Sequence, residues 1–473
     1  MTTSSSSKAT AISATSWPVE TGAGDGTVGP GRVCARQRVY RGFWHWAVRL
    51  LMVLHRIALV LAGLSPLRLR RRIGQERLNV LLTGTFYSEN WATAHLRPLA
   101  ASSACASLCV VSTFPVSSMP NLEIVYPPKW LVRVAGAVPA RLSVFAWLAI
   151  SRRPHVVGGF HLLVNGLVSA VLARLIGARS IYFCVGGPME LLDGGIWAEN
   201  RLFGRIGTPD PVVERQLIKA VGAFDLVITM GTRAVQFFRR NGVTSRFHVV
   251  SGGIDSDEYR PGDAQRSVDL ILVGRLAKIK RVDVFLSALT LVAKKIPEVS
   301  AVIIGDGELR AQLEELTREL GICRRVLFAG HQCKVADWLK RSRIFVLTSD
   351  SEGLALSMME AMMCGLPAVV SNVGDLADLV EDSVNGYLVD DRCPEAFASR
   401  IVDLLEDDQK LARFSQAARH AALRHDAADV ARKWDAILED EEMRRNQEEP
   451  NAVINRLASS RRQHLVSDKL GRS

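Results

Sequence analysis

The sequence lacks any arrangement of cysteines that would hold a metal ion or a disulfide framework. Its eight cysteines are scattered through 473 residues, without a C-x-x-C pair or a His/Cys ligand spacing. Most of them lie inside apolar segments, which is typical of buried free thiols in a reducing compartment. No cluster of carboxylates suited to a metal is evident either, so we expect a protein that needs no metal.

Near the N-terminus the sequence also lacks an apolar run long enough to span a bilayer. The longest stretch there without a charge or histidine, Ile57–Leu67, has eleven residues. A spanning helix needs about 20. An apolar content of 48% nevertheless excludes a largely disordered chain. The length predicts two or three domains, each with an ample core.

Acidic residues are almost absent from residues 41–77, which hold eight arginines and a single acid, Glu76. A basic block of this kind favours an anionic surface, either a membrane or nucleic acid. Within the block, Phe43 to Gly63 has a helical pattern with a wide apolar face. Two interpretations stand side by side: a helix lying in the membrane interface, or an extra helix packed on the first domain. A spanning helix ranks third.

Both ends of the chain are unlike the rest of it. Residues 1–40 are rich in Ser, Thr, Gly and Ala without a sustained period, which predicts a disordered tail. They do not resemble a secretory signal, because the apolar run lies too far into the chain. Residues 441–473 are charged, and we expect them to fray.

The most informative stretch is 343–373. Ile344–Leu347 is a short apolar run typical of a buried parallel strand. A polar turn at 348–353 leads into Leu354–Cys364, which is rich in helix-forming Leu, Met and Ala. Ala368–Ser371 is a second strand. The stretch therefore predicts one βαβ unit, whose turn lies at the strand end where open α/β sheets bind ligands.

Two glutamates, Glu352 and Glu360, belong to this turn and helix. With a helix start near Gly353, Glu352 stands at its mouth and Glu360 about two turns inside. The amides of Gly353, Leu354 and Ala355 would then form an anion site. Glu352 could instead be a helix N-terminal acid favoured by the macrodipole. Glu360 interrupts an apolar run, so its carboxylate is either paired or used by a ligand.

The segments Glu352-Gly353-Leu354, Glu360-Ala361-Met362 and Cys364-Gly365-Leu366-Pro367 together resemble the E-x7-E signature of retaining glycosyltransferases of family 4, which have the GT-B fold. The resemblance covers roughly residues 78–440. It implies an α/β protein with two Rossmann-like domains that face each other across a cleft. The implied division is an acceptor domain, a nucleotide-sugar domain and a crossover helix, at 78–262, 267–425 and 426–440.

A second motif of that family lies at the start of the second domain. Gly274 ends a predicted strand, Arg275 offers a planar fork to phosphate oxygens, and Lys280 offers a mobile charge. The spacing matches the G-R-x4-K of the family, in which the Arg and Lys hold the donor diphosphate. The motif precedes the glutamates by about 77 residues, as the family requires. His331, at a later strand end, falls where the family reads the base through backbone atoms.

The first domain carries weaker signals. Gly84 and Thr85 follow its first strand, in a loop that the resemblance places beside the acceptor and the donor phosphates. Family members usually have a histidine before the glycine at the position of Gly186, but here that residue is Val185. His161 follows the preceding strand. It either lies near the reacting sugar or is an ordinary loop histidine, and the second interpretation is modestly favoured.

The resemblance implies transfer of a sugar from a nucleoside diphosphate sugar with retention of configuration, without a metal or cofactor. Arg275, Lys280 and Glu352 would be the catalytic residues, with Glu352 on the sugar hydroxyls and Glu360 on the ribose. The expected acceptor is lipid-linked or a polysaccharide precursor, and the expected location is cytoplasmic, peripheral at the inner membrane face. No nucleic acid is expected as a partner. The alternatives are a non-catalytic sugar-nucleotide-binding subunit and a GT-B-fold sugar-nucleotide epimerase.

Overall fold

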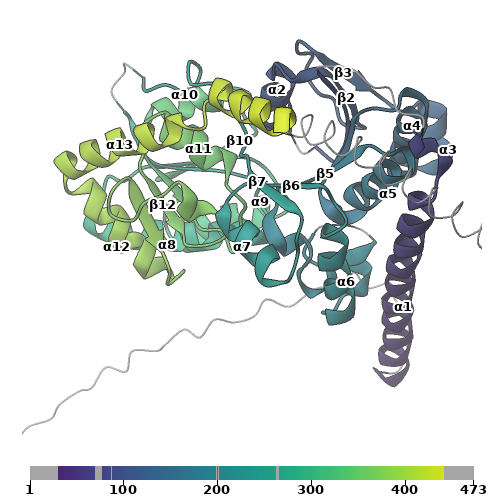
Figure 1. Cartoon of the computed structure of the whole chain (residues 1–473). Helices are drawn as coiled ribbons and strands as arrows, with labels where there is room; N and C mark the ends of the chain where they lie inside the picture. Colours follow the sequence, from purple (N-terminus) through teal and green to yellow (C-terminus); the bar gives the residue numbers. More distant parts are fainter. Residues whose placement is uncertain are drawn as a thin grey trace, which may run out of the picture.

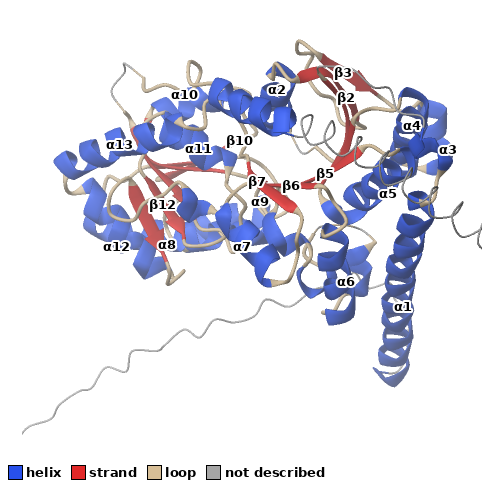
Figure 2. Cartoon of the chain, in the orientation of Figure 1, coloured by secondary structure: helices blue, strands red, loops and turns tan. Residues whose placement is uncertain are grey.

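The computed structural model describes residues 30–69, 77–86, 88–198, 200, 202–262 and 266–440, with the side chains of the first helix described from Gly42 onward. Two parallel β-sheets form the centres of two domains, and helices cover both (Figures 1 and 2). The α/β architecture expected from the sequence is confirmed. The predicted tails at 1–29 and 441–473 lie outside the described residues.

The first sheet has seven strands in the order β3-β2-β1-β4-β5-β6-β7, and every neighbouring pair is parallel. Its strands are β1 (Leu78–Thr83), β2 (Cys105–Val111), β3 (Leu122–Val125), β4 (Val156–Phe160), β5 (Arg179–Cys184), β6 (Leu226–Thr229) and β7 (Arg246–Val249). The chain first builds outward from β1 to β3 and then restarts at β4 on the other side of β1. This reversal is a topological switch point, the position where doubly wound sheets bind ligands.

The second sheet has six parallel strands in the order β10-β9-β8-β11-β12-β13. Its strands are β8 (Val268–Val273), β9 (Ala301–Ile304), β10 (Val326–Gly330), β11 (Ser342–Leu347), β12 (Ala368–Ser371) and β13 (Gly386–Val389). The central strands β8, β11 and β12 are largely buried, as expected of apolar strands covered on both faces. The switch point lies between β8 and β11, so the loops after these two strands are neighbours in space.

The helices that cover the sheets follow the strand–helix alternation. The α-helices are α1 (Pro30–Gly63), α2 (Glu89–Ala101), α3 (Lys129–Ala135), α4 (Ala137–Arg152), α5 (Leu167–Ile176), α6 (Pro211–Val221), α7 (Thr232–Arg240), α8 (Val282–Lys295), α9 (Arg310–Glu319), α10 (Val335–Lys340), α11 (Leu356–Met363), α12 (Pro394–Leu405) and α13 (Asp408–Leu423). Short helical turns are η1 (Pro66–Leu69), η2 (Leu162–Gly166), η3 (Gly187–Glu190), η4 (Leu192–Gly194), η5 (Phe203–Ile206), η6 (Lys278–Lys280) and η7 (Leu376–Asp378).

Helix α1 begins about ten residues earlier than the basic segment predicted at 41–77. Residues 30–40 are therefore helical, and the prediction of disorder for them was wrong. One face of α1 packs on the first domain, where Val48 and Met52 are buried. Beside them Nε of Arg49 donates to Oδ2 of the buried Asp210 over 3.0 Å, and the ring of His45 binds the same oxygen. The burial of Val48 and Met52 shows that α1 packs on the first domain, one of the two interpretations that the sequence left open.

The cysteines depart in part from the sequence expectation, whereas a helix is present at the position expected for the crossover helix, 426–440. Cys323, Cys333 and Cys393 are exposed, so burial does not describe all the thiols. Residues 427–440 form a helix that returns to the first domain, where Trp434 and Leu438 join the core around β1 and β2. The chain thus crosses between the domains twice, which limits how far they separate.

A further contact between the domains is a helix cap supplied in trans. Helix α7 of the first domain starts after Gly231, which has no side chain to cap it. Asp375 of the second domain accepts hydrogen bonds from the amides of Arg233 and Ala234, at 2.9 and 3.2 Å. A Cβ atom at Gly231 would lie 2.3 Å from that of Asp375. The approach of the two domains therefore depends on glycine at this position.

We expect Gly231→Ala to disrupt this interdomain cap and let the domains separate, at a cost of about 1 kcal/mol or more for the lost helix cap. Small-angle X-ray scattering would report the larger radius of gyration. Gly204→Ala is the matched control, because a Cβ atom there would meet nothing within 4 Å. Equal radii for the two variants would contradict the assignment of Gly231 as a contact that holds the domains together.

Candidate functional site

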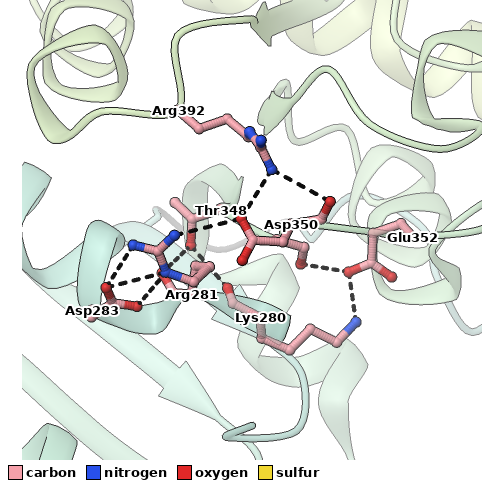
Figure 3. Close-up of polar contacts among 8 residues, drawn as sticks. Lys280, Arg281, Asp283, Thr348, Asp350, Glu352 and Arg392 are labelled. Atoms are coloured by element: carbon pink, nitrogen blue, oxygen red, sulfur yellow. Dashed lines mark hydrogen bonds and ion pairs between the residues drawn. The ribbon is translucent and has the colours of Figure 1, made fainter. Parts of the chain in front are cut away.

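Lys280 and Glu352 meet at the switch point of the second sheet (Figure 3). Lys280 ends the turn η6 after β8, and Glu352 lies in the loop that follows β11. Nζ of Lys280 donates to Oε1 of Glu352 over 2.6 Å, and the two side chains are 21% and 9% exposed. Because the pair is partly screened from water, it is stronger than a surface ion pair while still open to a ligand.

Ser349 is a third member of this contact that the sequence did not predict. Its hydroxyl donates to the same Oε1 over 2.6 Å, and the residue is buried. Within the described residues, Oε2 of Glu352 has no hydrogen-bond partner, so it is the oxygen that remains for a ligand. Ser349 lies in the polar turn between β11 and Glu352. Its position in this turn was the one feature of the sequence that could have indicated a role for Ser349 in the site.

The backbone that carries Lys280 is tied to the loop after β11. The hydroxyl of Thr348 donates to the carbonyl of Arg281 over 2.8 Å, and Arg281 pairs with Asp350 at 3.5 Å. Arg392 binds the same aspartate at 2.9 Å from the far side (Figure 3). These contacts hold the two loops together, so Lys280 and Glu352 meet without a bound ligand.

Glycine allows the loop around Glu352 to approach its neighbours closely. A Cβ atom at Gly353 would lie 2.5 Å from the carbonyl oxygen of Val185, which belongs to the first domain. A Cβ atom at Gly374 would lie 1.8 Å from the carbonyl oxygen of Glu352 itself. The loop after β5, which contains Gly186, therefore lies directly against the loop that contains Glu352. The structure brings together these residues from opposite domains.

Helix α11 begins at Leu356, so the predicted start near Gly353 was wrong by about three residues. Ala355 is its N-cap and has extended backbone, which allows the preceding turn to place Gly353 against the first domain. In the described part of the chain, the amides of Gly353, Leu354 and Ala355 donate to no acceptor. These amides belong to a turn rather than to a helix, and they remain suited to binding an anion.

Glu360 is consequently the fifth residue of α11, about one turn from its start rather than two. Burial raises its pKa to about 8, although a hydrogen bond from Tyr259 acts in the opposite direction. The charge of Glu258 raises this pKa further. Glu258 and Tyr259 lie in the segment between β7 and β8, so Glu360 faces the connection between the domains. The carboxyl group is buried, and among the residues that the structure describes it has no ion-pair partner.

The remaining predicted donor residues lie at strand ends of the second sheet. Gly274 directly follows β8, and its amide donates to the carbonyl of Ile304 at the end of β9. Arg275 is exposed beside it, and His331 is exposed directly after β10. All are at the carboxyl edge of the sheet. No group of three His, Cys, Asp or Glu side chains suited to a metal is found among the residues that the structure covers.

In the first domain, the loop at Gly84 and Thr85 is held by a buried arginine. Nη1 of Arg141, on α4, donates to the carbonyl of Gly84 over 2.6 Å, and Nη2 donates to Oδ1 of Asn165 over 2.7 Å. Burial lowers the pKa of Arg141 to about 10. A buried cation bound only to neutral oxygens is costly, so its presence indicates that the shape of this loop matters.

His161 follows β4 and has left-handed backbone, with φ at 62°. Its Nδ1 lies 3.5 Å from Oε2 of Glu190, which also accepts a hydrogen bond from the amide of Leu162. Oε1 of Glu190 accepts from the hydroxyl of Tyr182. The His161 ring is parallel to Trp91, with centroids 6.2 Å apart. Strain, a carboxylate partner and a stacked ring favour a positioned histidine over an ordinary loop residue.

Comparisons with known proteins agree with this geometry. Residues 257–421, which include every predicted donor residue, match the family model described as Glycosyl transferases group 1. The D-inositol 3-phosphate glycosyltransferase 2 of Catenulispora acidiphila is 35% identical over 241 residues, covering 45% of this chain and 56% of that protein. The N-acetyl-alpha-D-glucosaminyl L-malate synthase of Bacillus anthracis is 32% identical over 154 residues, covering 32% and 40%. The chain thus spans about half the length of these relatives.

Solved structures share the two-domain fold over most of the chain. The sucrose-phosphate synthase of Thermosynechococcus elongatus aligns with a TM-score of 0.62 at 17% identity, covering 77% of this chain and 99% of that one. HepE of Anabaena, solved with UDP-glucose, aligns with a TM-score of 0.60 at 18% identity, covering 77% and 100%. At 17% and 18% sequence identity, these alignments show a shared fold and not a shared function. The chain therefore has a GT-B fold, and residues 257–421 are similar to the glycosyl transferases group 1 family.

Proposed function

We propose that this protein transfers a sugar from a nucleoside diphosphate sugar to an acceptor, with retention of configuration. The observation that carries the proposal is the contact of Lys280, Ser349 and Glu352 at the switch point of a group 1 domain. A cation and backbone amides at this point would bind the diphosphate of a donor, and the carboxylate would bind the hydroxyl groups of its sugar. The Catenulispora acidiphila relative is named as a glycosyltransferase, which supports the reaction class.

In the proposed reaction the bond from the sugar anomeric carbon to the diphosphate breaks, and a bond to the acceptor oxygen forms. The leaving diphosphate gains negative charge. Arg275, Lys280 and the amides of 353–355 are charged or oriented before the reaction, so they stabilise that charge without reorganising. The acceptor attacks on the face that the diphosphate leaves, and its proton passes to the departing phosphate oxygen. No nucleophile and no metal from the protein are needed for this step.

The ion pair has a definite part in donor binding. When a diphosphate arrives, Lys280 redirects its ammonium group toward phosphate, and Glu352 then accepts hydrogen bonds from the sugar hydroxyls. Ser349 keeps the carboxylate oriented during this exchange, since it binds Oε1 from a buried position. Glu360 accepts hydrogen bonds from the ribose hydroxyls. These hydrogen bonds stabilise the ionised carboxylate, which burial otherwise keeps protonated. His161, held by Glu190, is placed to contact the sugar from the first domain.

For the acceptor, we propose a lipid-linked glycan or polysaccharide precursor used at the cytoplasmic face of a membrane. The support is the apolar and basic N-terminal segment, which belongs to the acceptor domain. A small anionic acceptor is the second candidate, because inositol 3-phosphate and L-malate occur in the names of the relatives. Uracil is the first donor base to test, in the form of UDP-sugars, because HepE was solved with UDP-glucose.

Transfer itself tests the proposal. Incubation with a panel of UDP- and GDP-sugars and with both acceptor classes should give a product that proton NMR assigns to the donor's anomeric configuration. We expect Glu352→Gln to lower kcat by about 100-fold, as for loss of one oriented transition-state contact. Glu315→Gln, on an exposed helix face, is the control and should not change kcat.

Three results would overturn the assignment in different ways. An inverted product would contradict retention. Recovery of an epimerised sugar nucleotide would identify an epimerase. Donor binding without transfer or hydrolysis, under every acceptor tested, would identify a binding subunit.

Donor binding should depend on pH through Glu360. Its pKa of about 8 means that at neutral pH the acid is largely protonated, and the ionised form accepts ribose hydrogen bonds better. Affinity for a nucleoside diphosphate sugar should therefore rise with pH until about pH 8 and then level off. Below that point it should fall by up to about tenfold per pH unit. Calorimetry of wild type and Glu360→Gln would measure this. A pH-independent wild type, or a variant with the same slope, would contradict the role of Glu360.

A further inference from the structure

The outer face of α1 carries a continuous apolar stripe that nothing in the described protein covers. Its large side chains are 39% to 65% exposed. They are Phe43, Trp46, Leu50, Val53, Leu54, Ile57, Val60 and Leu61. At 100° per residue these positions fall within an arc of about 120°, and the stripe is about 27 Å long. Single exposed apolar residues are ordinary, but a contiguous stripe of this length marks an interaction surface.

The opposite face of α1 is fixed to the first domain along the same length. His45 and Arg49 bind Asp210 near one end, and the ring of His55 binds the carbonyl of Leu167 further on. Ala62 is buried near the other end. By length and composition the segment Gly42–Gly63 could cross a membrane, although its longest run without a charge or histidine is too short to do so. Along this segment α1 packs on the first domain, so a spanning arrangement would carry the polar surface of that domain into the lipid.

Charge beside the stripe identifies its partner. Residues 41–77 carry eight arginines and one acid, so the segment is strongly basic. Arg56 lies beside one edge of the stripe by helical angle and is exposed. Arg49, next to it, is also exposed, but its charge is paired with Asp210. A protein partner needs no excess of positive charge around an apolar seam. An anionic bilayer attracts the arginines and accepts the apolar side chains at once.

Helices α3 and α4 extend this apolar surface. No residue of α3 is buried, although its sequence, KWLVRVA, is mainly apolar. Trp130 and Val134 are 65% and 82% exposed, and Trp147 on α4 is 65% exposed. Helices α1 and α4 both pack on α5, and in the view of Figure 1 α1, α3 and α4 all lie on the side of the first domain away from the second domain. Exposed tryptophans next to cations are typical of a membrane interface.

We propose that the first domain docks on an anionic membrane surface with α1 lying in the plane of the interface, its stripe in the lipid and its other face on the domain. The Trp130–Trp147 region of α3 and α4 forms the second contact. The binding is peripheral and reversible. It does not depend on the proposed reaction, so it stands or falls separately from the glycosyltransferase assignment.

Co-sedimentation of the full chain with vesicles tests this docking. The chain should sediment with vesicles of phosphatidylcholine mixed with phosphatidylglycerol, and less with phosphatidylcholine alone or at high salt. Trp46→Ser/Ile57→Ser/Val60→Ser should lower the partition coefficient by at least about tenfold, since three large side chains leave the lipid. The control is Leu327→Ser/Val384→Ser/Leu423→Ser on the second domain, whose apolar side chains are 37% to 52% exposed, against 49% to 65% for the three stripe residues. It should bind like the wild type.

Reversibility separates an in-plane helix from a spanning one. Bound protein should exchange from dye-labelled to unlabelled vesicles, and failure to exchange would overturn the in-plane arrangement. A wild type that stays in the supernatant, or a stripe variant that binds like the control, would overturn docking itself. Sedimentation velocity supplies the remaining outcome. If the wild type does not bind vesicles but forms a dimer, and if the stripe variant is monomeric while the control variant is not, then a second copy of the chain covers α1.

Discussion

The ion pair of Lys280 and Glu352 is the constraint on which the rest of the site depends. A lysine and a glutamate 72 residues apart meet at 2.6 Å because β8 and β11 are neighbours on either side of a topological switch. The hydroxyl of Ser349 and the loop contacts of Thr348 and Arg281 hold that meeting in place. A partly buried pair is costly to form unless its geometry is good, so these supporting contacts are what make it stable.

The same pair links the two domains. The carbonyl of Glu352 lies against Gly374, and the loop from there continues to Asp375, which caps α7 of the first domain. Gly353 lies against the carbonyl of Val185. A ligand that shifts the loop around Glu352 therefore acts on both interdomain contacts. We expect donor binding and the separation of the domains to be coupled through this short stretch of backbone, in which glycine permits each close approach.

Much of the second domain was predictable from local pattern. The run at 344–347, the helix that follows it and the strand at 368–371 all have sequence signals that do not depend on distant residues, and the structure confirms these elements. The helix start was misplaced, because the turn at Gly353 is set by contact with Val185 in the other domain. Ser349 was missed for a related reason: a serine in a polar turn has no pattern that reveals its partner.

The first domain yielded less, because its contacts join residues far apart in sequence. Nothing local predicts that Arg141 binds the Gly84 loop, or that Glu190 lies beside His161. Helix α1 shows the same limit. Its periodicity predicted a wide apolar face, but only the burial of Val48 and Met52 against the domain separates its inner face from its outer one.

The central claim is that Arg275 and Lys280 hold the diphosphate of a nucleotide donor, and calorimetry of nucleoside diphosphate binding tests it most directly. The account predicts that Arg275→Ala and Lys280→Ala each weaken binding by about 2 kcal/mol or more, as expected for charge-assisted hydrogen bonds. Lys278→Ala, an exposed cation two residues from Lys280, should leave the affinity unchanged. Equal affinity for wild type and the first two variants, or an equal loss in all three, would contradict it.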